Sequence, residues 1–299
     1  MTIEIENLHK AFGRHEALRG LSLAIPEGSA YALIGANGAG KTTTIKTLMN
    51  IIRPTRGTTR ILGVDSRRLG VAQLQRIGYV SENQDMPARL TVSQYLNYLR
   101  PFYPTWDRGL EHSILKELRL PAERRIGDLS HGMRMKMSLA CALPFRPRVL
   151  ILDEPFSGLD PLVRDEFMER LLQQAGEMTI LISSHELSEI EGATTHVGFI
   201  DQGRLLFQES MTELSDRFRL VRVTLESPDA PPGPAPEGWL QTTLAGNVVS
   251  FVDSRFSEQR LAEGLAARFK GVKNVEVQSL ALRRIFTTLA RESREGRPS

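Results

Sequence analysis

The sequence predicts an α/β fold with a largely parallel sheet, followed by a small α+β domain. Short apolar segments alternate with helix-like segments over about the first 210 residues, which is typical of a parallel sheet covered by helices. Several of the apolar segments are uninterrupted, as in strands that are buried on both faces. The alternation ends near residue 216, where the composition changes. A chain of 299 residues is long enough for one large domain and a smaller one.

The bulk composition is that of an ordinary soluble globular protein. Apolar residues make up 41% of the chain and charged residues 24%. The net charge of 38 − 35 = +3 is too small to argue for nucleic-acid binding. The single cysteine, Cys141, excludes an intrachain disulfide and suits a reducing cytosol. We find no signal peptide and no apolar run of about 18 residues, so we expect a chain that does not span a membrane. Contact with a membrane protein stays open.

The expected strands of the parallel sheet are short apolar segments. They cover residues 29–35, 77–82, 148–155, 179–185 and 196–201. Two earlier segments, 2–10 and 18–28, alternate polar and apolar residues, which favours an antiparallel flank. We expect a helix over residues 41–52, and another over residues 161–176 that begins with proline and ends at glycine.

Two regions depart from this alternation. Residues of about 85–145 have helix-like patterns without strands, so we expect a helical subdomain there, inside a first domain of residues 1–215. Residues 216–299 are expected to form a small C-terminal accessory domain, below the size that is comfortably stable alone. Within it, the proline-rich stretch 228–238 is unsuited to a helix or an interior strand.

A glycine-rich loop after the first buried strand has the spacing of a phosphate-binding loop. The stretch GANGAGKT fits the pattern G-x-x-x-x-G-K-[ST]. We expect its backbone N–H groups to wrap a β-phosphate, Lys41 to reach the β and γ oxygens, and Thr42 to ligate magnesium. A chance glycine loop is the alternative, but this one follows an expected strand and begins an expected helix. The candidate nucleotide-binding residues here are Gly35, Asn37, Gly38, Ala39, Gly40, Lys41, Thr42 and Thr43.

Polar side chains follow two other expected strands, at the edge where an α/β sheet presents its ligand site. Asp153 is expected to hold magnesium through water, and Glu154 to polarise a water for attack on a γ-phosphate. His185 is placed to hydrogen-bond a γ-phosphate oxygen. The alternatives are a turn with two solvated acids and a structural histidine. Phe12 is a candidate for stacking on adenine, with ordinary packing as the alternative.

Together these stretches resemble the ATP-binding cassette (ABC) family. The sequences GANGAGKTT, LSHGM, VLILDEP, SGLD and SSH occur in the order and spacing of that family, over about residues 2–215. The chain is similar to the nucleotide-binding subunit of an ABC transporter, and within that group to bacterial exporter subunits of the drug and antibiotic resistance type. The resemblance implies a phosphate-loop NTPase cassette that hydrolyses ATP, with magnesium as the metal.

The stretch LSHGM stands where the family has its signature, usually Leu-Ser-Gly-Gly-Gln. In the family, two cassettes dimerise head to tail, and the signature helix of one caps the γ-phosphate held by the other. The resemblance therefore assigns Ser130, His131 and Gly132 to a site on a second chain. It also assigns Asp160 to the loop that crosses between the two sites. His131 departs from the family pattern, because it replaces a glycine; an outward-pointing solvated side chain is the alternative for it.

A second departure lies in the loop that acts as a lid in the family. The family normally has a glutamine there, and an alignment without gaps puts Glu82 at that position, as a candidate metal ligand. A glutamate would add negative charge to an already anionic site. Gln84 could substitute for it if the loop shifts. The direction of the effect on turnover stays open.

Other residues in the helical region carry weaker signals. Trp106 is either an exposed anchor for the membrane partner, as the family's use of this subdomain suggests, or a buried residue. We expect the side chains of Cys141 and of the methionines in residues 133–137 to serve helix packing rather than a chemical role.

The resemblance implies a cytoplasmic ATPase subunit, peripheral on the inner face of the cell membrane. It would dimerise around two ATP molecules, with a second copy or a paralogous cassette, and drive a separate membrane permease for export. The alternative is a soluble ABC ATPase that acts on ribosomes or DNA without a permease. Such proteins usually carry two cassettes or a long coiled-coil insertion, and the sequence has neither, so we expect no direct nucleic-acid partner.

Overall fold

The structure, a computed structural model, describes residues 1–81, 84–156, 164, 168, 178–186, 190, 192, 194–227 and 235–295. The chain divides into two compact units, Met1–Gln208 and Glu209–Ser299. The division into residues 1–215 and 216–299 stays a prediction of domain organisation. Most of the expected helix over residues 161–176 lies outside the described residues. Among the described residues, no helix combines the length and the apolar composition that crossing a bilayer requires.

The central sheet of the larger unit has six strands, in the order β10-β9-β3-β8-β7-β6. The pairs that join β9, β3, β8, β7 and β6 are all parallel, which confirms the predicted α/β class and all five predicted strands. Strands β3 and β7 are buried throughout, as their uninterrupted apolar sequences predict. The strands are β3 (Ala30–Ile34), β6 (Ile77–Ser81), β7 (Val149–Asp153), β8 (Thr179–Ser184), β9 (His196–Asp201) and β10 (Arg204–Ser210).

A second sheet of the larger unit confirms the predicted antiparallel flank. Its strands are β1 (Ile3–Phe12), β2 (His15–Ile25), β4 (Arg56–Ile61) and β5 (Val64–Asp65), in the order β2-β1-β4-β5. One apolar core joins this sheet to the central sheet and to α1 (Lys41–Leu48). The core therefore fixes the start of α1, and with it the phosphate-loop motif, against the end of β3.

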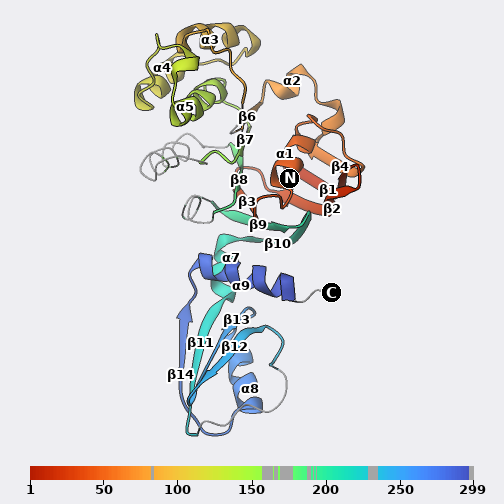
Figure 1. The fold of residues 1–299 in the computed structure, drawn as a ribbon, viewed down its shortest axis with the longest axis vertical. Coiled ribbons are helices and arrows are strands. Elements are labelled where there is room, and N and C mark those ends of the chain that lie inside the picture. The colour runs from red at the N-terminus through yellow and green to blue at the C-terminus, as the bar shows by residue number, and fades with distance from the viewer. Residues whose placement is uncertain are drawn as a thin grey trace. The chain divides into compact units, whose positions relative to one another are not determined.

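The predicted helical subdomain follows β6. Helix α2 (Val71–Leu74) precedes that strand, and α3, α4 and α5 pack together after it, with α5 against β6 (Figure 1). A side chain caps each of these three helices at its N-terminus by accepting a backbone N–H. Ser130 is the cap of α5. The helices are α3 (Val92–Leu99), α4 (Arg108–Glu117) and α5 (His131–Ala142), with short 3₁₀ turns at Ser66–Arg68, Arg100–Phe102 and Ile126–Asp128.

Trp106 belongs to the interior of the helical subdomain and is half-buried. Its Nε1 donates to Glu111 Oε2 at 2.7 Å, and its ring lies beside those of Tyr103 and Phe145. These contacts favour the packing alternative for Trp106. Cys141 is buried in α5, as expected of a packing residue.

The smaller unit is an antiparallel sheet with helices. The sheet order is β12-β13-β11-β14, and α8 packs its Leu261 and Leu265 on the face that carries Val221 and Phe251. The polar residues of β12 weaken the alternating apolar pattern by which a strand is recognised in a sequence. The elements are α7 (Met211–Arg217), β11 (Arg219–Leu225), β12 (Trp239–Ala245), β13 (Val248–Asp253), α8 (Glu258–Arg268), β14 (Val272–Ser279) and α9 (Leu282–Glu295).

Candidate functional site

The carboxyl ends of three neighbouring strands bring the main candidate residues together. Strands β3, β8 and β7 are adjacent and parallel, so their carboxyl ends share one edge of the sheet. The phosphate-loop motif follows β3, His185 follows β8, and Asp153 ends β7. Residues that are far apart in the sequence therefore meet where an α/β sheet presents its ligand site.

Close packing of the chain explains the first and last glycines of the loop. A Cβ on Gly35 would lie 2.2 Å from the backbone oxygen of Ile200. Gly40 has a φ of +112°, and a Cβ there would lie 2.8 Å from Leu18 Cδ2. No other residue type fits either position without displacing backbone or core. Between these two fixed points, residues 36–38 are exposed, so their backbone is accessible to an anion.

Lys41 is buried inside the loop, with 5% of its side chain exposed. Its Nζ donates to the backbone oxygen of Gly35 at 2.7 Å and to that of Ala36 at 3.2 Å. The same Nζ lies 3.0 Å from Glu154 Oε1. Two carbonyl oxygens and one carboxylate thus hold the buried ammonium.

Glu154 joins the phosphate loop to the end of β8. Its Oε2 lies 2.8 Å from His185 Nδ1, while its Oε1 faces Lys41. Its backbone N–H donates to Ser183 Oγ at 2.9 Å. The φ of Glu154 is +52°, a left-handed conformation that costs a non-glycine residue of the order of 1 kcal/mol or more. Such strain is typical of functional positions, and here it turns the carboxylate toward Lys41 and His185.

Asp153 is almost fully buried next to Glu154, with 3% of the residue exposed. Its Oδ1 accepts from Ser183 Oγ at 2.7 Å and from Thr42 Oγ1 at 3.1 Å. Burial raises the pKa of the Asp153 carboxyl, and the charge of Glu154 adds to the rise, although the hydrogen bonds from Ser183 and Thr42 oppose it. Ser183 is not among the predicted site residues, and its signal in the sequence is a polar residue at the end of an apolar strand.

A cavity of about 270 Å³ opens in front of these groups, between the start of α1 and the ends of β6 and β7. Thr42, Asp153, Glu154 and Gln84 are among the residues that line it. Gln84 Oε1 is buried, and it has no hydrogen-bond partner among the described residues. A buried oxygen of this kind needs a donor or a cation. Thr42 and Asp153 supply hard oxygen atoms of the kind that magnesium prefers, so the residues fit a magnesium ion.

The structure describes two of the three candidate metal ligands. Thr42 and Asp153 line the cavity, whereas Glu82 lies outside the described residues. Within the part of the chain that is described, no three or more His, Cys, Asp or Glu side chains gather to hold a metal. Of the two candidates that are described, one is a hydroxyl and the other a carboxylate.

The remaining candidates lie on other elements. Ser130 and His131 are exposed at the N-terminal end of α5, where Ser130 Oγ accepts the N–H of Met133 at 3.3 Å. Phe12, at the end of β1, is 50% exposed, and Lys10 Nζ lies 4.8 Å from the centre of its ring. Asp160 lies outside the described residues.

Comparison with known proteins gives consistent matches. The family model described as "ABC transporter" matches residues 18–157. The bacitracin transport ATP-binding protein BcrA of Enterococcus faecalis is 34% identical over 222 residues, which cover 73% of this chain and 72% of the relative. The Nod factor export ATP-binding protein I of Burkholderia lata is 34% identical over 209 residues, 68% of each chain. A solved structure described as "Structure of ATP binding subunit of ABC transporter" superposes with a TM-score of 0.66 at 27% identity, covering 72% of this chain and 92% of that one.

Proposed function

The chain belongs to the ABC transporter family as an ATP-binding ATPase subunit, and we propose that it dimerises around two ATP molecules to drive export through a separate membrane permease. The observation that carries the proposed site is the meeting of Lys41, Glu154 and His185 at one edge of the sheet, beside the Thr42–Asp153 hydrogen bond. The proposal of export rests on relatives whose names refer to bacitracin transport and Nod factor export.

Nucleotide binding is assigned to the loop after β3. The exposed backbone of residues 36–38 offers N–H groups to phosphate oxygens, and Lys41 offers its charge. To reach a phosphate, Lys41 exchanges the Glu154 carboxylate for a phosphate oxygen, another anionic partner. Gly35, Asn37, Gly38, Ala39, Gly40 and Thr43 complete the proposed binding loop, and Phe12 offers an exposed ring face for adenine.

Magnesium is assigned to the oxygen atoms of Thr42, Asp153 and Gln84. A bound magnesium ion would neutralise charge on the phosphate oxygens. Gln84 is preferred here over Glu82, because its buried oxygen lacks a partner among the described residues and the residue lines the same cavity as Thr42 and Asp153. Its neutral amide also adds no further negative charge to the site.

Hydrolysis is assigned to Glu154 with His185. Once Lys41 turns to phosphate, Oε1 of Glu154 is free to accept a proton from an attacking water. His185 Nδ1 holds the other carboxylate oxygen and so fixes the direction of the free one. In this arrangement His185 orients the base and presents its ring at the site of the γ-phosphate.

The partner assignments follow from the family. Ser130 and His131 are exposed and Gly132 is partly exposed at the start of α5, where a signature acting on a second chain is expected, and Asp160 is assigned to the loop between the two sites. We place the subunit on the inner face of the cell membrane, held there by the permease. Co-purification from membranes tests that partner: recovery with an integral membrane protein supports the proposal, and recovery with ribosomes or DNA contradicts it.

The catalytic assignment is tested with Lys41→Ala and Glu154→Gln in the full chain. Lys41→Ala should lose ATP binding, because the phosphate oxygens lose their counter-charge. Glu154→Gln should bind ATP but turn it over more slowly by about two to four orders of magnitude. Glu27→Gln makes the same change at an exposed glutamate outside the site, so it serves as the matched control. Near-normal turnover in Glu154→Gln would remove Glu154 from the mechanism.

A further inference from the structure

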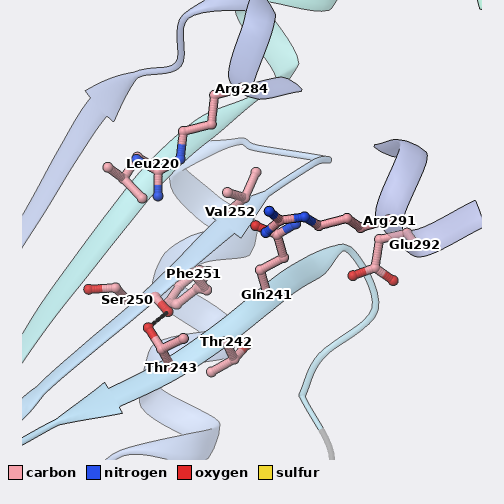
Figure 2. A pocket seen from close by; sticks show the side chains of 10 residues that line it. All are labelled: Leu220, Gln241, Thr242, Thr243, Ser250, Phe251, Val252, Arg284, Arg291 and Glu292. Carbon is pink, nitrogen blue, oxygen red and sulfur yellow. Dashed lines mark hydrogen bonds between the residues drawn. The ribbon is translucent and has the colours of Figure 1, made fainter. Parts of the chain in front are cut away.

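A second cavity lies wholly within the smaller unit, and its volume is about 380 Å³. It lies between α9 and the sheet residues Leu220, Ser250 and Val252 (Figure 2). Strand residues alternate between faces, so these three lie opposite the core that Val221 and Val249 form with α8. The volume falls within the range of small-molecule pockets, which runs from about 300 to 1,000 Å³.

Two arginines of α9 line this cavity. Arg284 and Arg291 are seven residues apart, so they lie on the same side of the helix, about 10 Å apart along its axis. Both side chains extend from the helix over the strands in Figure 2. Where the unit is described, neither guanidinium has a recorded carboxylate or carbonyl partner, whereas Arg217 and Arg255 of the same unit are paired with Glu209 and Glu237. Among the residues described, the cavity is therefore lined by two arginines without an ion-pair partner and by one carboxylate, Glu292.

A bulge in β12 adds polar groups to the same wall. The pairing of β12 with β13 shifts by one residue between Leu240 and Thr243, and Gln241 has a φ of +51°. As a result, the consecutive residues Gln241, Thr242 and Thr243 all line the cavity, which a regular strand would not allow. The bulge therefore adds an amide and hydroxyl groups to the wall of the cavity, and bulges of this kind often re-aim side chains at functional sites.

From this arrangement we propose that the smaller unit binds a small amphipathic organic anion. The acidic group of the ligand lies against Arg284 and Arg291, which suit carboxylate or phosphate oxygens. Its short apolar part lies on Leu220 and Val252, and the polar residues of the β12 bulge hold its edge. The inference does not depend on the proposed transport function, because every residue of this cavity lies outside the ATP site.

The test uses heptanoate as the probe, titrated into the full chain by calorimetry. Heptanoate has both a carboxylate and an apolar tail, so we expect saturable binding. Acetate and heptanol each supply only one of these parts and should bind more weakly. The double variant Arg284→Gln/Arg291→Gln should weaken heptanoate binding by about tenfold or more, because charge-assisted hydrogen bonds are lost.

Two matched variants locate the site. Arg283→Gln removes an exposed arginine of the same helix that does not line the cavity, so it should bind heptanoate normally. Lys41→Ala should also bind it normally, because the ATP site is separate. Failure of heptanoate to bind the full chain overturns the proposal, as does unchanged binding in the double variant or an equal loss in Arg283→Gln.

A further variant covers the case in which the double variant fails to fold. Thr242 is exposed at the rim of the cavity, so Thr242→Glu should leave the sheet intact while placing a negative charge beside the ligand. It should weaken heptanoate binding and leave heptanol binding unchanged. Unchanged heptanoate affinity in a folded Thr242→Glu chain would overturn the proposal.

Discussion

Lys41 Nζ lies 3.0 Å from Glu154 Oε1, and both side chains are largely buried, with 5% and 14% exposed. The residue proposed to bind phosphate and the residue proposed to activate water therefore neutralise each other. A phosphate that draws Lys41 away releases the carboxylate for its role as a base. Under the proposed function, nucleotide binding would therefore also activate the base.

The exchange predicts that Glu154→Gln binds ATP more tightly than the natural sequence. Glutamine is neutral, so Lys41 no longer has to leave an ion pair before it meets a phosphate. We expect a gain of up to about tenfold in affinity, equivalent to about 1.4 kcal/mol. Equilibrium binding of a fluorescent ATP analogue measures it. Weaker binding in Glu154→Gln would show that the ion pair does not compete with nucleotide.

The same ion pair should stabilise the fold when no nucleotide is added. A double-mutant cycle with Lys41→Met, Glu154→Gln and the double variant should give a coupling free energy of about 1–3 kcal/mol, because each single change leaves a mostly buried charge without its partner. Urea unfolding of the four proteins supplies the values. As a control, a cycle between Lys41 and the exposed Glu27 should give no coupling. A coupling free energy near zero between Lys41 and Glu154 would contradict their ion pair.

The raised pKa of Asp153 predicts that this residue lowers stability at neutral pH. Burial is the main reason why the ionised carboxyl of Asp153 is unfavourable in the folded chain. The folded chain therefore keeps this proton to a higher pH than the unfolded chain, in which the carboxyl has its ordinary pKa of 3.8. The loss of stability from ionising Asp153 is absent below pH 3.8 and complete above the raised pKa. Asp153→Asn should therefore unfold at a higher temperature at pH 7 in EDTA, with the difference shrinking as the pH falls.

Magnesium should reverse this order, because the natural carboxylate gains a cation and the asparagine does not. Thermal scans with and without the metal, from about pH 4 to pH 8, follow the effect. Asp128→Asn is the control, since Asp128 is exposed and should give no such pH dependence. A less stable Asp153→Asn chain at pH 7 in EDTA would mean that the hydrogen bonds from Ser183 and Thr42 outweigh burial.

Gln84 and Glu82 give opposite predictions for the metal. If Gln84 Oε1 completes the magnesium site, Gln84→Ala should raise the magnesium concentration for half-maximal ATPase by about tenfold, while Glu82→Ala changes it little. Binding of ATP without metal should be the same in both variants. The reverse result, with the loss in Glu82→Ala, would assign the ligand to the position that an ungapped alignment gives.

The strand ends of the site could be predicted from the sequence, but the contacts between their side chains could not. Uninterrupted apolar runs mark β3, β7 and β8, and parallel strands must present their carboxyl ends at one edge. The pairing of Glu154 with both Lys41 and His185, however, depends on a left-handed backbone that glutamate rarely adopts. No periodicity or motif signals that conformation.

The same limit explains what was missed in the smaller unit. Strand β12 has polar residues on both sides of a bulge, so its period-2 pattern is interrupted at Gln241. The cavity beneath α9 depends on that bulge and on the way the helix lies over β13. These are tertiary features, which the local sequence pattern of the segment does not signal.

The final prediction concerns Ser130 and Lys41, which we propose act on one nucleotide from two different chains. Ser130 is exposed at the start of α5, where a phosphate on another chain could reach it. Ser130→Arg and Lys41→Ala should each abolish ATPase activity when present in both subunits. When the two variants are mixed, one site of the mixed dimer carries both changes and the other site carries neither. Some activity should therefore return.

The recovery should reach at most one working site per mixed dimer, measured as ATPase against the mixing ratio. Mixing Ser130→Arg with Ser130→Arg/Lys41→Ala is the control, because every site then faces an altered signature and activity should stay absent. Isolated Ser130→Arg chains should still bind ATP, since the phosphate loop of the same chain is intact. If they do not, or if mixing restores nothing, α5 acts on its own chain's loop and the two-chain site is wrong.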